Sequence, residues 1–126
     1  MKPINEMTIQ ECNECLAVHM FGMYYHNCPD DSNTGWHSLD GSECFREVPD
    51  YTHPDNVWQV VDKLLEPING KYTVHEVKIS ANEATIGFAC INDDETIVEE
   101  YIEEYGETSA EALVRAAVEY CRRCDK

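Results

Sequence analysis

Basic residues are scarce in this sequence, and from residue 79 to residue 114 there is neither a lysine nor an arginine. The whole chain of 126 residues has 9 Lys and Arg against 25 Asp and Glu, a formal net charge of −16. Binding to a nucleic-acid backbone or to an anionic membrane depends on clustered Lys and Arg. The composition therefore argues against nucleic acid or a membrane as a direct partner, and it suits a basic protein partner, a divalent cation or simple solubility.

Long apolar runs are missing as well. No segment approaches the length that crosses a bilayer, and residues 1–20 lack the unbroken apolar stretch of a signal peptide. The seven cysteines are an odd number, which fits poorly with the disulfide framework of a secreted protein. We therefore expect a cytoplasmic protein with reduced thiols.

The sequence also lacks the common signatures of catalytic sites. It has no Gly-x-Ser-x-Gly, no phosphate-binding Gly-rich loop and no His-Glu-x-x-His. No set of nucleophile, base and orienting group can be assembled from it. We predict that the protein is not an enzyme, that it needs no cofactor and that it has no catalytic residue.

Ten carboxylates stand in the segment that lacks basic residues. Three have local explanations, because Glu83 lies in a predicted turn and Glu107 and Glu111 lie at a predicted helix start, where the helix dipole favours negative charge. A charge run is most often a solvated surface. The seven carboxylates without such an explanation are the predicted partner-binding residues: Asp93, Asp94, Glu95, Glu99, Glu100, Glu103 and Glu104.

Apolar residues that recur every three or four positions predict helices in three places. The first begins at Thr8, where residues 8–11 read as a capping box, and the second begins near His53-Pro54 and ends before Pro67. The third begins at a second capping box, residues 108–111, and its stripe runs to Cys124.

Two runs rich in β-branched and aromatic residues, 72–79 and 85–91, predict an antiparallel hairpin. A phase shift between Val74 and Val77 predicts a bulge, or burial on both faces. Earlier in the chain, Asp40-Gly41 predicts a turn between two short strands, 36–39 and 42–45.

Residues 96–105 are ambiguous. Their apolar residues follow a helical period with the glutamates outside, whereas their residue types favour a strand. The pattern alone leans towards a helix. The apolar residues of the segment are Ile97, Val98, Tyr101, Ile102 and Tyr105.

Two Cys-x-x-Cys pairs, Cys12 with Cys15 and Cys121 with Cys124, have a spacing that suits a tetrahedral zinc ion. Most of these cysteines lie on apolar stripes, however, and buried structural cysteine is common. We predict no metal.

Of the two tryptophans, Trp58 is predicted at the edge of the core, and Trp36 is the better candidate for an exposed contact.

The order of elements and two stretches, 51–61 (YTHPDNVWQVV) and 107–117 (ETSAEALVRAA), resemble the phage ABA-sandwich domain of small bacteriophage and prophage proteins. The resemblance covers nearly the whole chain, although the loop at 27–50 and the acidic run depart from it. It implies one α+β domain over residues 1–126, with an antiparallel sheet of about three strands packed with three helices, as in an α-β-α sandwich. It also implies that 96–105 is the third strand, and we adopt that prediction. No activity or catalytic residue transfers from the family.

Together these features predict a small acidic phage or prophage accessory protein in the cytoplasm of a bacterial host. We expect it to bind a basic host protein, in the sharpest form by occupying the nucleic-acid channel of a defence nuclease in the manner of anti-CRISPR proteins. A homodimer through the edge beside 96–105 is an additional expectation. One alternative is a protein that sequesters a nucleotide or another small molecule, with Arg115 on a phosphate. The other is a zinc-stabilised structural module.

Overall fold

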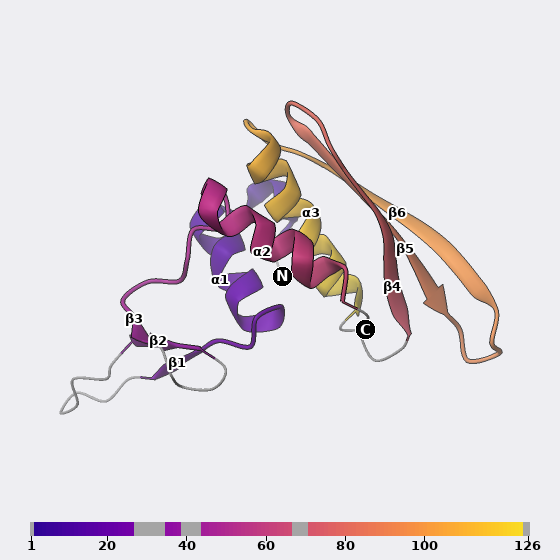
Figure 1. Ribbon diagram of the computed structural model, residues 1–126, viewed down its shortest axis with the longest axis horizontal. Helices are drawn as coiled ribbons and strands as arrows, with labels where there is room; N and C mark the ends of the chain where they lie inside the picture. Colours follow the sequence, from indigo (N-terminus) through magenta and orange to yellow (C-terminus); the bar gives the residue numbers. More distant parts are fainter. Residues whose placement is uncertain (1, 27–34, 39–43, 67–70, 125–126) are drawn as a thin grey trace.

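The computed structural model describes residues 2–26, 35–38, 44–66 and 71–124, and this part of the chain has an α+β fold. It contains three α-helices and two three-stranded antiparallel sheets. Figure 1 shows the larger sheet at one end of the molecule, the helices in the middle and the smaller sheet at the other end. The predicted α+β class is confirmed.

The larger sheet has the order β4-β5-β6. Its strands are β4 (Tyr72–Ile79), β5 (Glu83–Ile91) and β6 (Ile97–Tyr105). The predicted hairpin is formed by β4 and β5, and the register shifts between Val74 and Glu76, which confirms the predicted bulge.

One face of this sheet packs against α3 (Ser109–Cys124). Alternate residues of β5, from Ala84 to Cys90, are buried on that face, and the ring of Phe88 meets Tyr120 of α3 edge to face at a centroid distance of 5.1 Å. Among the helices α3 is the most extensively buried. Its buried residues are Ala112, Leu113, Val114, Ala116, Ala117, Val118, Tyr120 and Cys121.

The remaining helical elements lie on the side of α3 that faces away from the sheet: η1 (Ile4–Glu6), α1 (Ile9–His19) and α2 (Pro54–Leu64). The predicted capping box at Thr8 is present, and His53 caps α2 through its ring nitrogen, which accepts from the backbone N–H of Asp55. The resulting layers are the sheet, then α3, then α1 and α2. No helix covers the outer face of the sheet within the described residues.

Residues 97–105 form a strand, as the family resemblance implies, and not the helix that their apolar period suggests. In the strand the apolar residues divide between two faces. Ile102 is buried against α3, whereas Ile97 and Tyr101 point to the outer face. The β-branched and aromatic side chains fit this pleated surface, so residue type outweighs the helical period.

The smaller sheet combines β1 (Tyr24–His26), β2 (Gly35–His37) and β3 (Cys44–Phe45). The predicted pairing of the segments around Trp36 and Phe45 is confirmed. The predicted turn at Asp40-Gly41 lies outside the described residues. β1 is only three residues long and is not among the strands predicted from the sequence.

A membrane-spanning helix would need a longer and more apolar stretch than any helix in the described residues provides.

The side chain of Arg115 joins α3 to the N-terminal segment. Its Nη1 donates to the carbonyl oxygens of Ile4 and Met7, and its Nε and Nη2 donate to Glu111 at 3.2 Å. Only 12% of the Arg115 side chain is exposed. The guanidinium is therefore committed to holding η1 on α3, and it is not presented to a phosphate as the nucleotide alternative requires.

Replacing Arg115 with Ala should lower the free energy of unfolding by about 3 kcal/mol, because the change leaves Glu111 and two carbonyl oxygens without their donor. Denaturant titration followed by circular dichroism measures this loss. Arg123→Ala on the same helix is the control, since the ion pair of Arg123 with Glu119 is more exposed and should contribute less than about 1 kcal/mol. Equal losses in the two variants would contradict the structural role of Arg115.

Candidate functional site on the outer sheet face

The seven predicted partner-binding carboxylates do not share one face. Strand alternation and the pairing of β5 with β6 place Glu99 and Glu103 on the outer face of the sheet. Glu100 and Glu104 point inward, towards α3. The other three, Asp93, Asp94 and Glu95, lie in the turn between β5 and β6.

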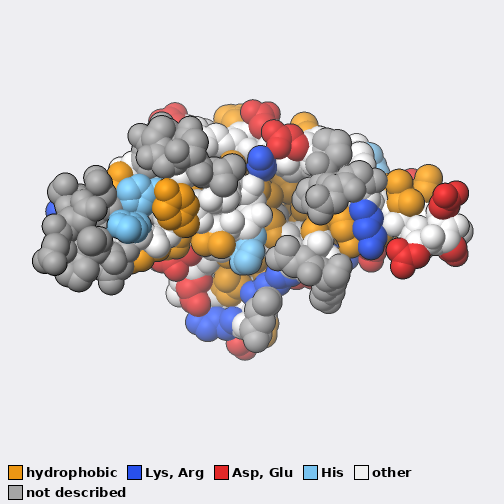
Figure 2. All heavy atoms as spheres, turned by 90° about the horizontal axis from the view of Figure 1, so that it is seen from below, with side chains coloured by type: hydrophobic (Ala, Val, Ile, Leu, Met, Phe, Trp, Pro, Cys, Tyr) orange, Lys and Arg blue, Asp and Glu red, His pale blue; other side chains and the backbone are white. Residues whose placement is uncertain are grey.

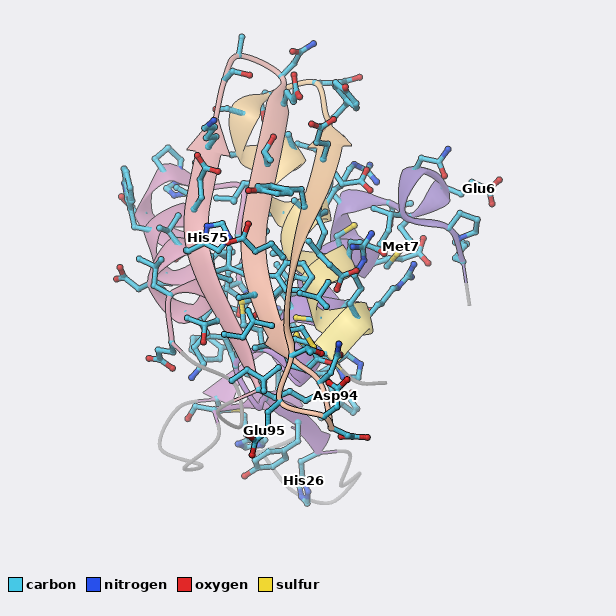
Figure 3. All side chains as sticks on the ribbon, turned by 90° about the vertical axis from the view of Figure 1, so that its right-hand side faces the viewer. Glu6, Met7, His26, His75, Asp94 and Glu95 are labelled. Atoms are coloured by element: carbon cyan, nitrogen blue, oxygen red, sulfur yellow. The ribbon has the colours of Figure 1, made fainter. Side chains whose placement is uncertain are left out.

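The outer face alternates carboxylates with large apolar side chains along β6. Ile97, Tyr101 and Tyr105 are 68%, 52% and 60% exposed, and Glu99 and Glu103 stand between them. Figure 3 looks onto this face, and Figure 2 shows red acidic and orange hydrophobic side chains next to one another at the end of the molecule that the sheet forms. We call these five residues the β6 outer face.

A glycine at the centre of the sheet shapes this surface. A Cβ atom on Gly87 would lie 2.9 Å from a ring carbon of Tyr101 and 3.0 Å from one of His75. Without that atom, the rings of Tyr101 and His75 meet across β5 in an edge-to-face contact with a centroid distance of 6.0 Å. The contact fixes Tyr101 beside the two carboxylates. His75 is labelled in Figure 3.

The aromatic half of this surface is not among the residues predicted from the sequence to bind a partner. Although a strand is predicted for residues 96–105, only its carboxylates are among the predicted binding residues, and Tyr101 and Tyr105 are counted with the apolar residues of the segment. The signal that could have found them is the alternation itself: once 97–105 is a strand, its odd-numbered residues are Ile, Glu, Tyr, Glu and Tyr on a single face.

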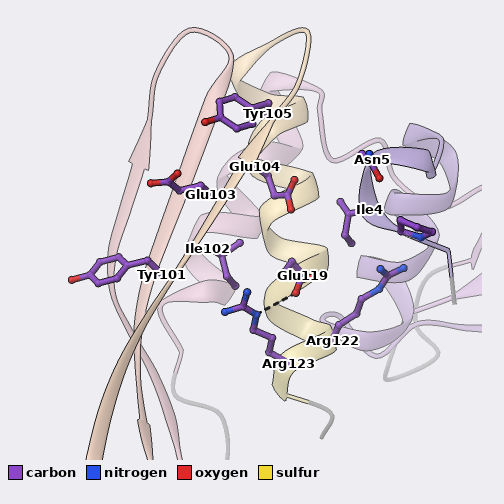
Figure 4. A pocket seen from close by; sticks show the side chains of 11 residues that line it. Ile4, Asn5, Tyr101, Ile102, Glu103, Glu104, Tyr105, Glu119, Arg122 and Arg123 are labelled. Carbon is purple, nitrogen blue, oxygen red and sulfur yellow. Dashed lines mark hydrogen bonds and ion pairs between the residues drawn. The ribbon is translucent and has the colours of Figure 1, made fainter.

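The two inward carboxylates are partly neutralised by the end of α3. The Glu100 carboxylate lies 3.8 Å from the Arg123 guanidinium, which also binds Glu119 at 3.2 Å (Figure 4). Partial burial, followed by the charge of Glu119, raises the pKa of Glu104. These glutamates belong to the contact between sheet and helix, so they are poorer candidates for partner binding than the β6 outer face.

The turn carboxylates have structural roles of their own. The Asp94 carboxylate accepts from the backbone N–H of Thr96 at 3.0 Å and from its hydroxyl group, which lowers the pKa of Asp94. Glu95 has φ +68°, a left-handed conformation that glycine adopts most easily. Asp94 and Glu95 therefore shape the β5–β6 turn.

Glu95→Gly should raise the free energy of unfolding by about 0.5–1 kcal/mol, because glycine relieves the left-handed strain at this position. Glu95→Ala removes the same carboxylate and keeps the strain, so it serves as the matched control. Thermal and chemical denaturation at neutral pH measure both. An alanine variant as stable as the glycine variant would show that the gain comes from the charge and not from the backbone.

Glu104→Gln should stabilise the protein at pH 7 by a few tenths of a kcal/mol, about the scale of partly exposed charges. The raised pKa means that the fold favours the neutral carboxyl. The contribution of Glu104 to the free energy of unfolding is fully present at a pH below 4.5, the ordinary pKa of a glutamate. It is lost as the pH rises through the pKa of Glu104 in the folded protein. The advantage of the variant should therefore vanish below that ordinary value, which unfolding curves across the pH range would reveal.

The control for this substitution is Glu103→Gln, which removes an equal charge from the exposed face of the same strand. A Glu104→Gln protein that is less stable than the wild type at pH 7 would contradict the prediction.

The two Cys-x-x-Cys pairs do not form a four-thiolate site. Cys12 is buried in α1 and Cys121 is buried in α3, whereas Cys15 and Cys124 are partly exposed. Among the described residues, no three His, Cys, Asp or Glu side chains gather closely enough to hold a metal ion. The zinc-stabilised alternative therefore finds no support in the described part of the chain.

The two tryptophans lie opposite to their predicted environments. Trp58 is 66% exposed on α2, so its predicted place at the core edge is wrong. Trp36 is partly buried, packs against the core and meets Tyr25 edge to face. Trp58 follows Val57, which is partly buried against the core and lies on the same side of α2 as the buried Val60; a shift of one position on a helix turns a side chain towards solvent.

Comparisons with protein-family models, with curated proteins and with solved structures found no match. The resemblance to the phage ABA-sandwich domain therefore stays a prediction. The assignment of function depends on the geometry of the chain itself.

Proposed function

We propose that this protein acts without catalysis, by binding a basic surface of another protein through the β6 outer face. The observation that carries the proposal is the outer face of the sheet, which no helix covers in the described part of the chain and where exposed Ile97, Tyr101 and Tyr105 alternate with Glu99 and Glu103. Contact surfaces between proteins are enriched in such aromatic residues.

The charge of the chain supports a basic partner. Glu99 and Glu103 belong to the stretch that contains no lysine or arginine, whereas the inward Glu100 pairs with Arg123 of α3. Carboxylates beside exposed tyrosines suit arginine in particular, because its guanidinium can pair with the acid and stack on the ring. Opposite charge also speeds the encounter between partners and makes their binding sensitive to salt.

The finer form of the proposal concerns the identity of the partner. Surfaces that hold nucleic acid are the most basic surfaces that proteins commonly present, because they must neutralise phosphates. A strongly acidic protein that covers such a channel competes with the nucleic acid. We therefore propose that the partner is a nucleic-acid-binding protein of a bacterial host, such as a defence nuclease. This acidic protein would inhibit that partner.

The test uses two double variants that remove equal charge from opposite faces of one strand. Glu99→Gln with Glu103→Gln alters the outer face, and Glu100→Gln with Glu104→Gln alters the inner face. Each protein is titrated into a panel of purified bacterial nucleases bound to labelled DNA, and release of the DNA is followed by fluorescence anisotropy at several salt concentrations.

We expect the wild type to displace DNA from a susceptible nuclease, and the outer-face variant to need about tenfold more protein for the same effect. The inner-face variant should stay within about threefold of the wild type. Equal losses in both variants would mean that net charge alone acts, and they would contradict the proposed surface. Failure to displace DNA from any nuclease would overturn the finer form of the proposal.

A further inference from the structure

The outer edge of β6 is an unpaired strand edge. Within the described residues β6 pairs with β5 on one side and with no strand on the other. The N–H of Asn92 donates to Thr96 and the N–H of Gly106 donates to Asn82, so the hydrogen-bonded pairs of this ladder fall on the even-numbered residues of β6. The odd-numbered residues therefore turn their own N–H and C=O groups to the free edge: Ile97, Glu99, Tyr101, Glu103 and Tyr105.

An open groove of about 550 Å³ runs along this edge. Its wall on the sheet side consists of five consecutive residues, Tyr101–Tyr105. A strand face would contribute only alternate residues, so a consecutive run means that the groove follows the edge of the strand. The opposite wall is formed by Pro3, Ile4 and Asn5 near η1 together with the end of α3 (Figure 4).

A second copy of this chain is a poor occupant for the groove. If two β6 strands paired antiparallel at this edge, they would set glutamates opposite or diagonal to glutamates, because four of the nine residues are Glu. Like charges in such positions destabilise a strand pair. Charge of this kind on an edge strand is also a recognised protection against self-pairing. The predicted homodimer therefore receives no support from this edge.

The chemistry of the two sides of the groove specifies what an added strand would carry. Its outward side chains would stand beside Glu99, Tyr101 and Glu103, which favours Lys or Arg. Its inward side chains would meet the apolar surfaces of Ile4 and Ile102, where the nearby acids are accompanied by arginines of α3. Uncharged aliphatic residues fit that side.

We infer that the β6 edge binds an extended segment of a partner protein as an additional strand, in which basic residues alternate with aliphatic ones. This inference rests on the proposed function and names the form in which the basic partner is recognised. In such strand addition, main-chain hydrogen bonds supply affinity and alternate side chains supply specificity.

The first arm of the test uses synthetic peptides. The probe alternates Lys and Val (Lys-Val-Lys-Val-Lys-Val-Lys, with blocked ends), and its matched control carries N-methyl groups on alternate residues along one edge. Both peptides have the same side chains and charge, but the methylated edge cannot donate hydrogen bonds. Two methylated forms, one for each edge, cover both orientations. We expect at least one of them to bind about tenfold more weakly in calorimetry.

The second arm changes the protein at one position. Glu103→Pro removes both the carboxylate and an N–H that faces the groove, whereas Glu103→Thr removes the carboxylate and keeps the N–H. Proline is tolerated at this site because the lost N–H is not part of the β5–β6 ladder. We expect Glu103→Pro to bind the unmethylated probe about tenfold more weakly than Glu103→Thr does. Circular dichroism of both variants is the control that checks whether they keep the fold.

The outcomes separate this inference from the proposed function. Equal binding of the unmethylated and both methylated peptides, or no binding of any of them, would overturn strand addition. The proposed function would still stand if the outer-face variant loses its competition with DNA. A wild-type dimer that Glu103→Pro converts to a monomer in sedimentation would mean that a second copy occupies the edge, and it would overturn the inference as well.

Discussion

The burial of α3 on two opposite sides determines how the rest of the structure is arranged. One side of the helix covers the sheet, and the other receives α1, α2 and η1. Small residues at Ala112, Ala116 and Ala117 allow close approach on both sides. Because a single helix serves as the core of both contacts, the described helices stack on one face of the sheet, and no helix within the described residues covers its outer face.

The carboxylates of the chain fall into two groups with different surroundings. The inward Glu100 of β6 pairs with Arg123 of α3 and helps to hold the sheet on the helix, and Glu111 pairs within α3 with Arg115, which holds η1. The carboxylates of the β6 outer face alternate with the exposed side chains of Ile97, Tyr101 and Tyr105, so the repulsion between them is relieved when a cation arrives. Net charge alone does not distinguish these two groups, whereas strand alternation does.

Much of the fold could be predicted from local chemistry. Short-range patterns predict the two helix starts that have a threonine cap and the proline start of α2. They also predict the β4–β5 hairpin and its bulge. The candidate site could not be predicted in the same way. Whether Glu99 and Glu100 face solvent or a helix depends on which side of the sheet α3 covers, and that is set by contacts far apart in the sequence. The exposure of Trp58 was missed for the same kind of reason, since nothing within α2 states where the neighbouring layer ends.

The two-sided burial of α3 also has a consequence for synthesis on the ribosome. This helix follows every other described element in the chain, and it contacts the N-terminal segment across a separation of 111 residues, between Arg115 and Ile4. Neither the sheet nor the N-terminal helices can bury their apolar faces until α3 emerges, and such long-range closure is slow. During that interval an incomplete chain exposes a strand edge. Glutamates along that edge disfavour its pairing with the same edge of another chain, because like charges opposite one another destabilise a strand pair.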